Sequence, residues 1–201
     1  MAGWSWCAGL ACGAVIAAIA SASGATQSYD AYKNFTLKNN PNGAWSYLVA
    51  GSPLNDPVEC ENNKKFPCWW NDEQLPDSAI VGANKAGQSI SYYTIILPPK
   101  YLVLDPESLD DVAVQWTAPS AGSVDVTGNF LAVDQDEASH TVAILHNTST
   151  LKSYTISAYG QKEKFHLKVQ VKNGDTISFV NYSGGQTDYL STGLQAKLVP
   201  N

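Results

Sequence analysis

The stretch KFHLKVQVKNGDTISF, residues 164–179, decides the fold class of this chain. Apolar and polar residues alternate from Phe165 to Val171, and the alternation resumes at Ile177 after the dipeptide Asn173-Gly174. A side-chain period of two places the apolar set on one face of a β-sheet. Because Asn-Gly between two such runs is a strong turn signal, the stretch predicts an antiparallel β-hairpin.

The same alternation extends over most of residues 111–198, and shorter β-like segments precede it. No segment shows a helical stripe over three turns. Many short strands at this spacing are typical of an all-β sandwich or barrel. We expect strands at residues 34–37, 44–50, 79–81, 90–97, 101–104, 112–117, 123–133, 141–146, 152–157, 164–172, 176–182 and 193–199, and a long loop at 51–77.

Residues 1–25 have the composition of a secretory signal peptide, although no Lys or Arg precedes the apolar core. The apolar run from Ala8 to Ala20 is too short for a membrane span, which needs about 20 residues. We expect cleavage after Ala25, with an uncleaved anchor as the alternative. The mature chain, residues 26–201, is then a single β-sandwich domain that is secreted or held at the cell surface, with no stable membrane insertion.

The charge balance argues against two classes of partner. The formal net charge is −6, and every basic residue is a lysine. Arginine supplies the bidentate fork that reads phosphates and guanines. We therefore expect no nucleic-acid partner and no anionic membrane partner.

Two of the four cysteines leave with the signal peptide, and Cys60 and Cys68 remain. An even pair in an exported chain predicts a disulfide. The closed ring is short, so in the loop-entropy model the bond stabilises the fold by about 2–3 kcal/mol.

Five motifs in the mature chain resemble one family. LVLDP (102–106) and VQWTAPSAG (114–122) look like its "LHP … VRWTAPAAG", and NNPNGAWSY (39–47) looks like its "NPNGxWSYG". GDTISF (174–179) and YLSTGL (189–194) look like its "GDTIDF" and "DSTGL". The family comprises bacterial secreted jelly-roll domains of the kind found in PEP-CTERM-sorted proteins, similar to carbohydrate-binding modules.

The resemblance implies an all-β, antiparallel jelly-roll β-sandwich of about 8–10 strands, and carbohydrate binding as the first function to consider. This chain departs from the family at three positions, where Asp105, Gln115 and Leu190 replace its His, Arg and Asp. No sorting tail follows the domain here, so we expect a protein that is free or held by contacts.

The carbohydrate-binding hypothesis centres on Trp69 and Trp70 in the long loop. Sugars lay their apolar ring faces on flat aromatic rings, while amides and carboxylates bind the hydroxyls. Neighbouring residues of an extended segment face opposite ways, so we expect one indole to be exposed. The other reading is that both rings cap the core. The amide and acidic side chains expected to complete the site are Asn62, Asn71 and Asp72.

Calcium is the candidate cofactor, because it takes hard oxygen ligands and acidic runs flank the strands. One run lies at residues 105–111 and the other at 134–137. Asp30 and Asp188 are an alternative pair of ligands if the termini meet. Solvated acidic turns are the plainer reading of all these groups.

We expect no enzyme, since Gly-x-Ser-x-Gly is absent and no spacing singles out a catalytic triad. The first hypothesis is a secreted, non-catalytic protein that binds a polysaccharide at the cell surface or in the extracellular matrix. The alternative is a self-associating structural subunit of an extracellular layer or filament, since β-sheet edges are templates for pairing. A glycan-active enzyme is the third reading.

Overall fold

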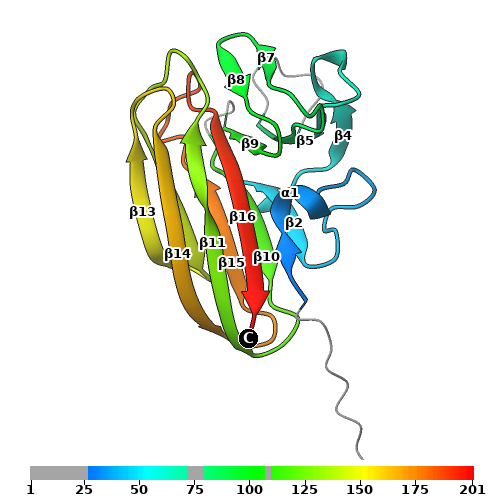
Figure 1. Ribbon diagram of the computed structural model, residues 1–201, viewed down its shortest axis with the longest axis vertical. Coiled ribbons are helices and arrows are strands. Elements are labelled where there is room, and N and C mark those ends of the chain that lie inside the picture. The colour runs from blue at the N-terminus through cyan, green and yellow to red at the C-terminus, as the bar shows by residue number, and fades with distance from the viewer. Residues whose placement is uncertain (1–26, 72–78, 107–109) are drawn as a thin grey trace, which may run out of the picture.

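The computed structural model describes residues 27–71, 79–106 and 110–201, and the expected signal peptide lies outside them. These residues form an antiparallel β-sandwich in which two large sheets pack face to face (Figure 1). A single α-helix of four residues, α1 (Ala31–Asn34), precedes the second strand. Among the described helices, none is long and apolar enough to cross a membrane.

Every strand pairs in antiparallel fashion. The larger sheet, sheet A, has the order β14 (Lys162–Val171), β11 (Gly122–Ala132), β16 (Thr192–Pro200), β9 (Leu102–Asp105), β6 (Ile80–Ala83), β5 (Pro67–Trp70) and β4 (Asp56–Glu59), with β1 (Tyr29–Asp30) also paired to β16. Sheet B has the order β13 (Ser149–Ile156), β12 (His140–His146), β15 (Thr176–Asn181), β10 (Val112–Thr117), β2 (Trp45–Val49) and β3 (Ser52–Pro53). The strands β7 (Ile90–Tyr92) and β8 (Ile95–Leu97) form a separate hairpin.

The chain crosses between the sheets at most turns of its C-terminal half. The Asn173-Gly174 turn forms, with Gly174 at φ 85°, but it does not close the expected hairpin. Strand β14 pairs with β11 in sheet A, whereas β15 pairs with β10 and β12 in sheet B. Both strands bury one face, and here the two faces pack against each other across the core. The predicted jelly-roll sandwich is confirmed, with more strands than the expected 8–10 because several are short.

The alternating residues meet between the two sheets. Trp45, Trp116 and Phe130 are among the largest fully buried side chains, and Phe165 stacks on Phe179 with ring centroids 5.5 Å apart. A second, smaller apolar cluster lies under the β7–β8 hairpin and includes Val103. Because Leu102 and Leu104 belong to the main core, Val103 faces the outer side of sheet A. The outer face of sheet A is therefore covered beneath this hairpin.

The N-terminal half differs most from expectation. Residues 34–37 are not a strand. Asn34 ends α1, which the Asp30 carboxylate caps by accepting a hydrogen bond from Lys33 N at 2.9 Å, and Phe35 is the C-cap. The expected loop at 51–77 contains β3, β4, a 3₁₀ turn (Cys60–Asn62) and β5. Strand β4 was not expected because it contains Pro57, which argues against a strand. Proline is tolerated there because β4 is an edge strand.

Candidate functional site

The tryptophan pair of the sequence hypothesis does not form an exposed platform. Trp69 is 4% exposed, lies in the main core and donates a hydrogen bond from Nε1 to Thr36 O at 2.9 Å. Trp70 faces the second cluster and is half-buried. Asn62 is exposed and Asn71 half-buried, while Asp72 lies outside the described residues. The indole of Trp69 therefore has no face to offer a sugar, and that part of the hypothesis is wrong.

The predicted disulfide is confirmed, since Cys60 and Cys68 are bonded. Both residues are buried in the second cluster, so the bond lies inside packed structure rather than on a surface loop. Gly82 is packed against it: an added Cβ would lie 2.7 Å from Cys68 Sγ. The disulfide therefore holds β4 and β5 beneath the β7–β8 hairpin.

The proposed ligand pair Asp30 and Asp188 does not come together. Asp30 pairs in register with Lys197, near the end of β16, whereas Asp188 precedes Thr192, where β16 begins. The five residues from Thr192 to Lys197 span about 16 Å of extended strand. In the described parts of the chain, no group of three His, Cys, Asp or Glu side chains is arranged to hold a metal ion.

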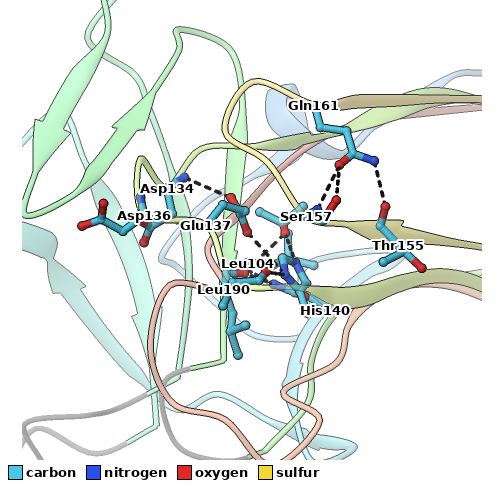
Figure 2. Close-up of polar contacts among 12 residues, drawn as sticks. Leu104, Asp134, Asp136, Glu137, His140, Thr155, Ser157, Gln161 and Leu190 are labelled. Carbon is cyan, nitrogen blue, oxygen red and sulfur yellow. Dashed lines mark hydrogen bonds and ion pairs between the residues drawn. The ribbon is translucent and has the colours of Figure 1, made fainter.

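The structure instead joins the two acidic runs at one end of the sandwich. Asp105, at the end of β9, and Asp134, in the turn between β11 and β12, are both buried. In the same turn, the Glu137 side chain is only 1% exposed and accepts a hydrogen bond from Asp134 N at 3.3 Å. Figure 2 shows this buried acidic turn, with His140 next to Glu137.

His140 is held through both ring nitrogens. Nδ1 donates to Ala138 O at 2.9 Å, and Nε2 lies 2.8 Å from Thr192 Oγ1 on β16. Asn181 adds a second tie between the sheets, because its amide donates to Leu104 O and Leu190 O at 3.0 and 2.7 Å. The turn is thus fixed to strands of both sheets.

Burial sets the protonation of this cluster. Desolvation raises the pKa of Glu137 to about 8; the Asp134 N–H opposes this shift, and the carboxylates of Asp134 and Asp105 add to it. Burial lowers the pKa of His140, and its hydrogen bond to the Ala138 carbonyl partly opposes that change. At neutral pH, Glu137 is therefore protonated and His140 is neutral.

A glutamate with a raised pKa is the usual mark of a general acid, but buried structural networks shift pKa values too. Glu137 is closed to solvent, so a substrate bound at the surface does not reach its carboxyl group. The acidic turn therefore serves to position the loops around it.

Three of those loops carry exposed tyrosines. Gln135 N donates to Thr94 O at 2.9 Å, Ala138 N to Tyr189 O at 2.8 Å, and Gly160 N to Ala132 O at 3.1 Å. These bonds place Tyr93, Tyr159 and Tyr189 around the same end, and they are 89%, 48% and 47% exposed. We call this surface the tyrosine end. Three of the four exposed large apolar side chains among the described residues belong to it.

Two of these tyrosines have unusual backbone conformations. Tyr93 has φ 46° and Tyr189 has φ 62°, in the left-handed region that bulky residues avoid at a cost of about 1–2 kcal/mol each. Neither ring is buried, so packing does not offset this cost. Strained residues of this kind are typical of functional sites. Sequence patterns missed them, since a lone tyrosine in a loop has no distinguishing signal.

Comparison with known proteins gives no sequence match and several structural neighbours of low similarity. No family model matches this chain, and no curated protein matches it. Structural neighbours include a family 35 carbohydrate-binding module from Clostridium thermocellum (TM-score 0.36, 16% identity, 72% of this chain and 98% of that chain). The CBM36-1 domain of a multidomain xylanase from the hindgut metagenome of Trinervitermes trinervoides is another (0.35, 15%, 57% and 90%).

The K1 cleaved adhesin domain of Lys-gingipain from Porphyromonas gingivalis W83 is also similar (TM-score 0.39, 12% identity, 89% of this chain and 99% of that chain). The chain spans only 21% of the Podospora anserina GH26-CBM35 mannanase that it matches. At these TM-scores the likenesses carry no argument about ligand or activity.

Proposed function

We propose that this protein is a secreted, non-catalytic carbohydrate-binding protein that holds a polysaccharide at the cell surface or in the extracellular matrix through its tyrosine end. The observation that carries the proposal is the gathering of Tyr93, Tyr159 and Tyr189 on loops at one end of a rigid sandwich. Functional loops on a β-sandwich cluster at its ends in this way.

The chemistry of the tyrosine end suits a glycan. Phenol rings offer flat apolar faces to the C–H faces of a sugar, at a small cost in side-chain entropy. Exposed amide and carboxylate side chains lie in the Tyr189 loop and in the 134–139 turn that is hydrogen-bonded to the tyrosine loops, and they can hydrogen-bond to sugar hydroxyls. They are Gln135, Asp136, Gln186 and Asp188.

Secretion has separate support. The Cys60–Cys68 bond is of a kind that persists in oxidising compartments, and residues 1–25 read as a signal peptide. N-terminal sequencing of the protein exported from its host tests this directly. A mature chain that begins at Thr26 is the expected result, and retention of the protein inside the cell would count against secretion.

The binding proposal is tested with residues 26–201 on a broad glycan array, followed by titration of the best ligand. Tyr93→Ala and Tyr189→Ala should each weaken binding roughly tenfold, which corresponds to about 1.4 kcal/mol. Leu151→Ala is the matched control, because Leu151 is exposed on β13, away from the tyrosine end. Trp70→Ala tests the remaining half of the tryptophan hypothesis. If the wild type binds no glycan class, the proposal is wrong.

A structural subunit is the second candidate, and strand β13 is the observation that favours it. β13 is an eight-residue strand at the edge of sheet B, mostly exposed, and no other described strand pairs with its outer side. Such an edge is a template for pairing between copies. Light scattering over a wide concentration range tests this, and Leu151→Lys should block assembly. A strictly monomeric wild type would rule it out.

A further inference from the structure

We infer that the outer face of β14, β11 and β16 is a second binding surface, and that it binds an acidic polysaccharide carrying carboxylate or sulfate groups. This surface lies along the body of sheet A and borders the tyrosine end at Lys162, which follows the loop of Tyr159. This inference deepens the proposed function. It rests on that proposal in one respect only, which is that the ligand is a glycan in both.

Lysines gather on this face of an otherwise acidic protein. In β14, buried Phe165 and Val169 alternate with exposed residues that point outward. Across the three strands and the adjoining segments, the face carries six of the chain's twelve lysines. They are Lys33, Lys100, Lys162, Lys164, Lys168 and Lys197. We call these residues, with the strands beneath them, the basic face.

The strand register sets the spacing of the charges. Lys168 pairs with Asp125, Lys164 with Asn129, and Thr127 with Lys197. Neighbouring strands lie about 4.8 Å apart, and alternate residues about 6.6 Å apart. Lys162 and Lys164 are therefore about 7 Å apart, Lys164 and Lys168 about 13 Å apart, and Lys197 lies about 10 Å across the sheet from β14. Such a spaced array of positive charges suits a linear polyanion.

Few carboxylates neutralise the face. Asp125 is the one carboxylate at the outward positions of β14, β11 and β16, and Asp30 on the adjoining β1 lies in register with Lys197. In the described part of the chain, Lys33 pairs with Asp30 at 3.8 Å, but Lys100, Lys164 and Lys197 form no ion pair. Clustered lysines without ion-pair partners do not stabilise the fold of a protein whose net charge is −6. We therefore attribute the clustering to charge complementarity with a ligand.

A groove at one edge of the basic face is the candidate binding site for a charged sugar. It has a volume of about 380 Å³ and is lined by three lysines (Lys33, Lys100 and Lys197), one carboxylate (Asp30), and Tyr32, Gln195 and Thr127. Its floor is backbone at Gly128 and Ala196. This volume lies within the usual range for small-ligand pockets. A charged sugar would meet cations for its acid group and amide and hydroxyl groups for its hydroxyls.

The chemistry favours an acidic glycan over nucleic acid. The face has lysines but no arginine, so it lacks the bidentate fork for phosphate, and it offers no row of exposed aromatic rings for bases.

Dextran, carboxymethyl-dextran and dextran sulfate share one backbone and differ in charge, so together they test the inference. We expect binding to the two charged polymers, but not to dextran, and weakening as NaCl is raised. The triple variant Lys164→Gln, Lys168→Gln, Lys197→Gln should lose at least about tenfold in affinity, as expected for three exposed charges. Asp125→Asn should gain affinity.

The matched control removes three exposed lysines elsewhere, with Lys38→Gln, Lys64→Gln and Lys65→Gln. It changes net charge equally and should leave binding unchanged. Equal losses in both triple variants would reduce the effect to net charge and overturn the inference. Equally tight binding of single-stranded DNA would overturn the assignment of a glycan.

The two proposals fail separately. Tyr93→Ala should retain binding of a short carboxymethyl-dextran fragment, which is too small to reach from the basic face to Tyr93. A wild type that binds neutral array glycans but neither charged dextran refutes this inference and leaves the proposed function standing. A wild type that binds the charged dextrans but no neutral array glycan refutes the tyrosine site and supports the basic face.

Discussion

Glu137→Gln should stabilise the protein above neutral pH. The substitution keeps the size and shape of the side chain and removes its ionisation. Burial raises the pKa of Glu137 to about 8, from an ordinary value of 4.5. Between these two pH values the folded state holds a proton that the unfolded state has lost, so the free energy of unfolding falls as pH rises.

The size of the effect follows from the shift. A difference of about 3.5 pKa units corresponds to at most about 5 kcal/mol at pH 8, and relaxation of the turn on ionisation reduces it, so we expect about 2–5 kcal/mol. At pH 5 Glu137 is protonated in the folded state, and the variant and the wild type should then differ by less than about 1 kcal/mol.

Urea unfolding followed by tryptophan fluorescence at pH 5, 6, 7 and 8 measures this difference. The lowered pKa of His140 acts in the opposite direction: its contribution to stability is present above pH 6.5 and is lost as pH falls below that value. Because His140 is present in both proteins, its contribution largely cancels in their difference.

A variant that is less stable than the wild type at pH 8 would refute the reasoning. It would mean that Glu137 is ionised in the folded state and pairs with a charged His140, whose Nδ1 lies 3.3 Å from Oε1. The same titration with calcium and with a chelator extends the test. If calcium stabilised only the wild type, Glu137 would be an ionised metal ligand.

Three further predictions concern the disulfide, its packing and the burial of the aromatic residues, and each is tested by equilibrium urea unfolding. The double variant Cys60→Ala, Cys68→Ala should lose about 2–3 kcal/mol, as expected for a short ring, and an unchanged midpoint would show that the bond does not stabilise the fold. Gly82→Ala should cost about 1–3 kcal/mol, because its Cβ would lie 2.7 Å from Cys68 Sγ, and a neutral result would mean that the sulfur moves freely. Trp69→Ala should cost about 3–5 kcal/mol, whereas Tyr93→Ala should change stability by less than about 0.5 kcal/mol, and equal effects would contradict their burial.

The strands of the C-terminal half were predictable because a period of two is a local property of the backbone. Residues 112–117 form β10 as expected, and β11, β12, β14, β15 and β16 differ from their expected bounds by one or two residues. The partner of each strand was not predictable in this way. Asn173-Gly174 specifies a tight turn, but not whether the next strand joins the same sheet or crosses to the other.

The candidate site was harder to predict from the sequence than the fold, because the exposure of a side chain depends on contacts between residues far apart in sequence. Trp69 and Trp70 differ in burial through what packs on each face of β5, which no pattern around them encodes. The acidic runs that suggested calcium do meet, at Asp105 and Asp134, but only because β9 and β11 end at the same level of sheet A, beside Thr192. Tyr93 and Tyr189 became candidates through hydrogen bonds to the 134–139 turn.

Strand β11 joins the two proposed surfaces, and this has a measurable consequence. The strand passes through the basic face at Asp125 and reaches the tyrosine end at Ala132, about 23 Å further along. A long acidic polysaccharide can therefore contact both surfaces at once, whereas a disaccharide cannot. Binding of the second surface is then intramolecular and raises the affinity without new contacts. We expect Tyr189→Ala to weaken binding of a long polymer more than binding of its disaccharide to the basic face, measured by calorimetry on both. Equal losses for the two lengths would show that the surfaces act independently.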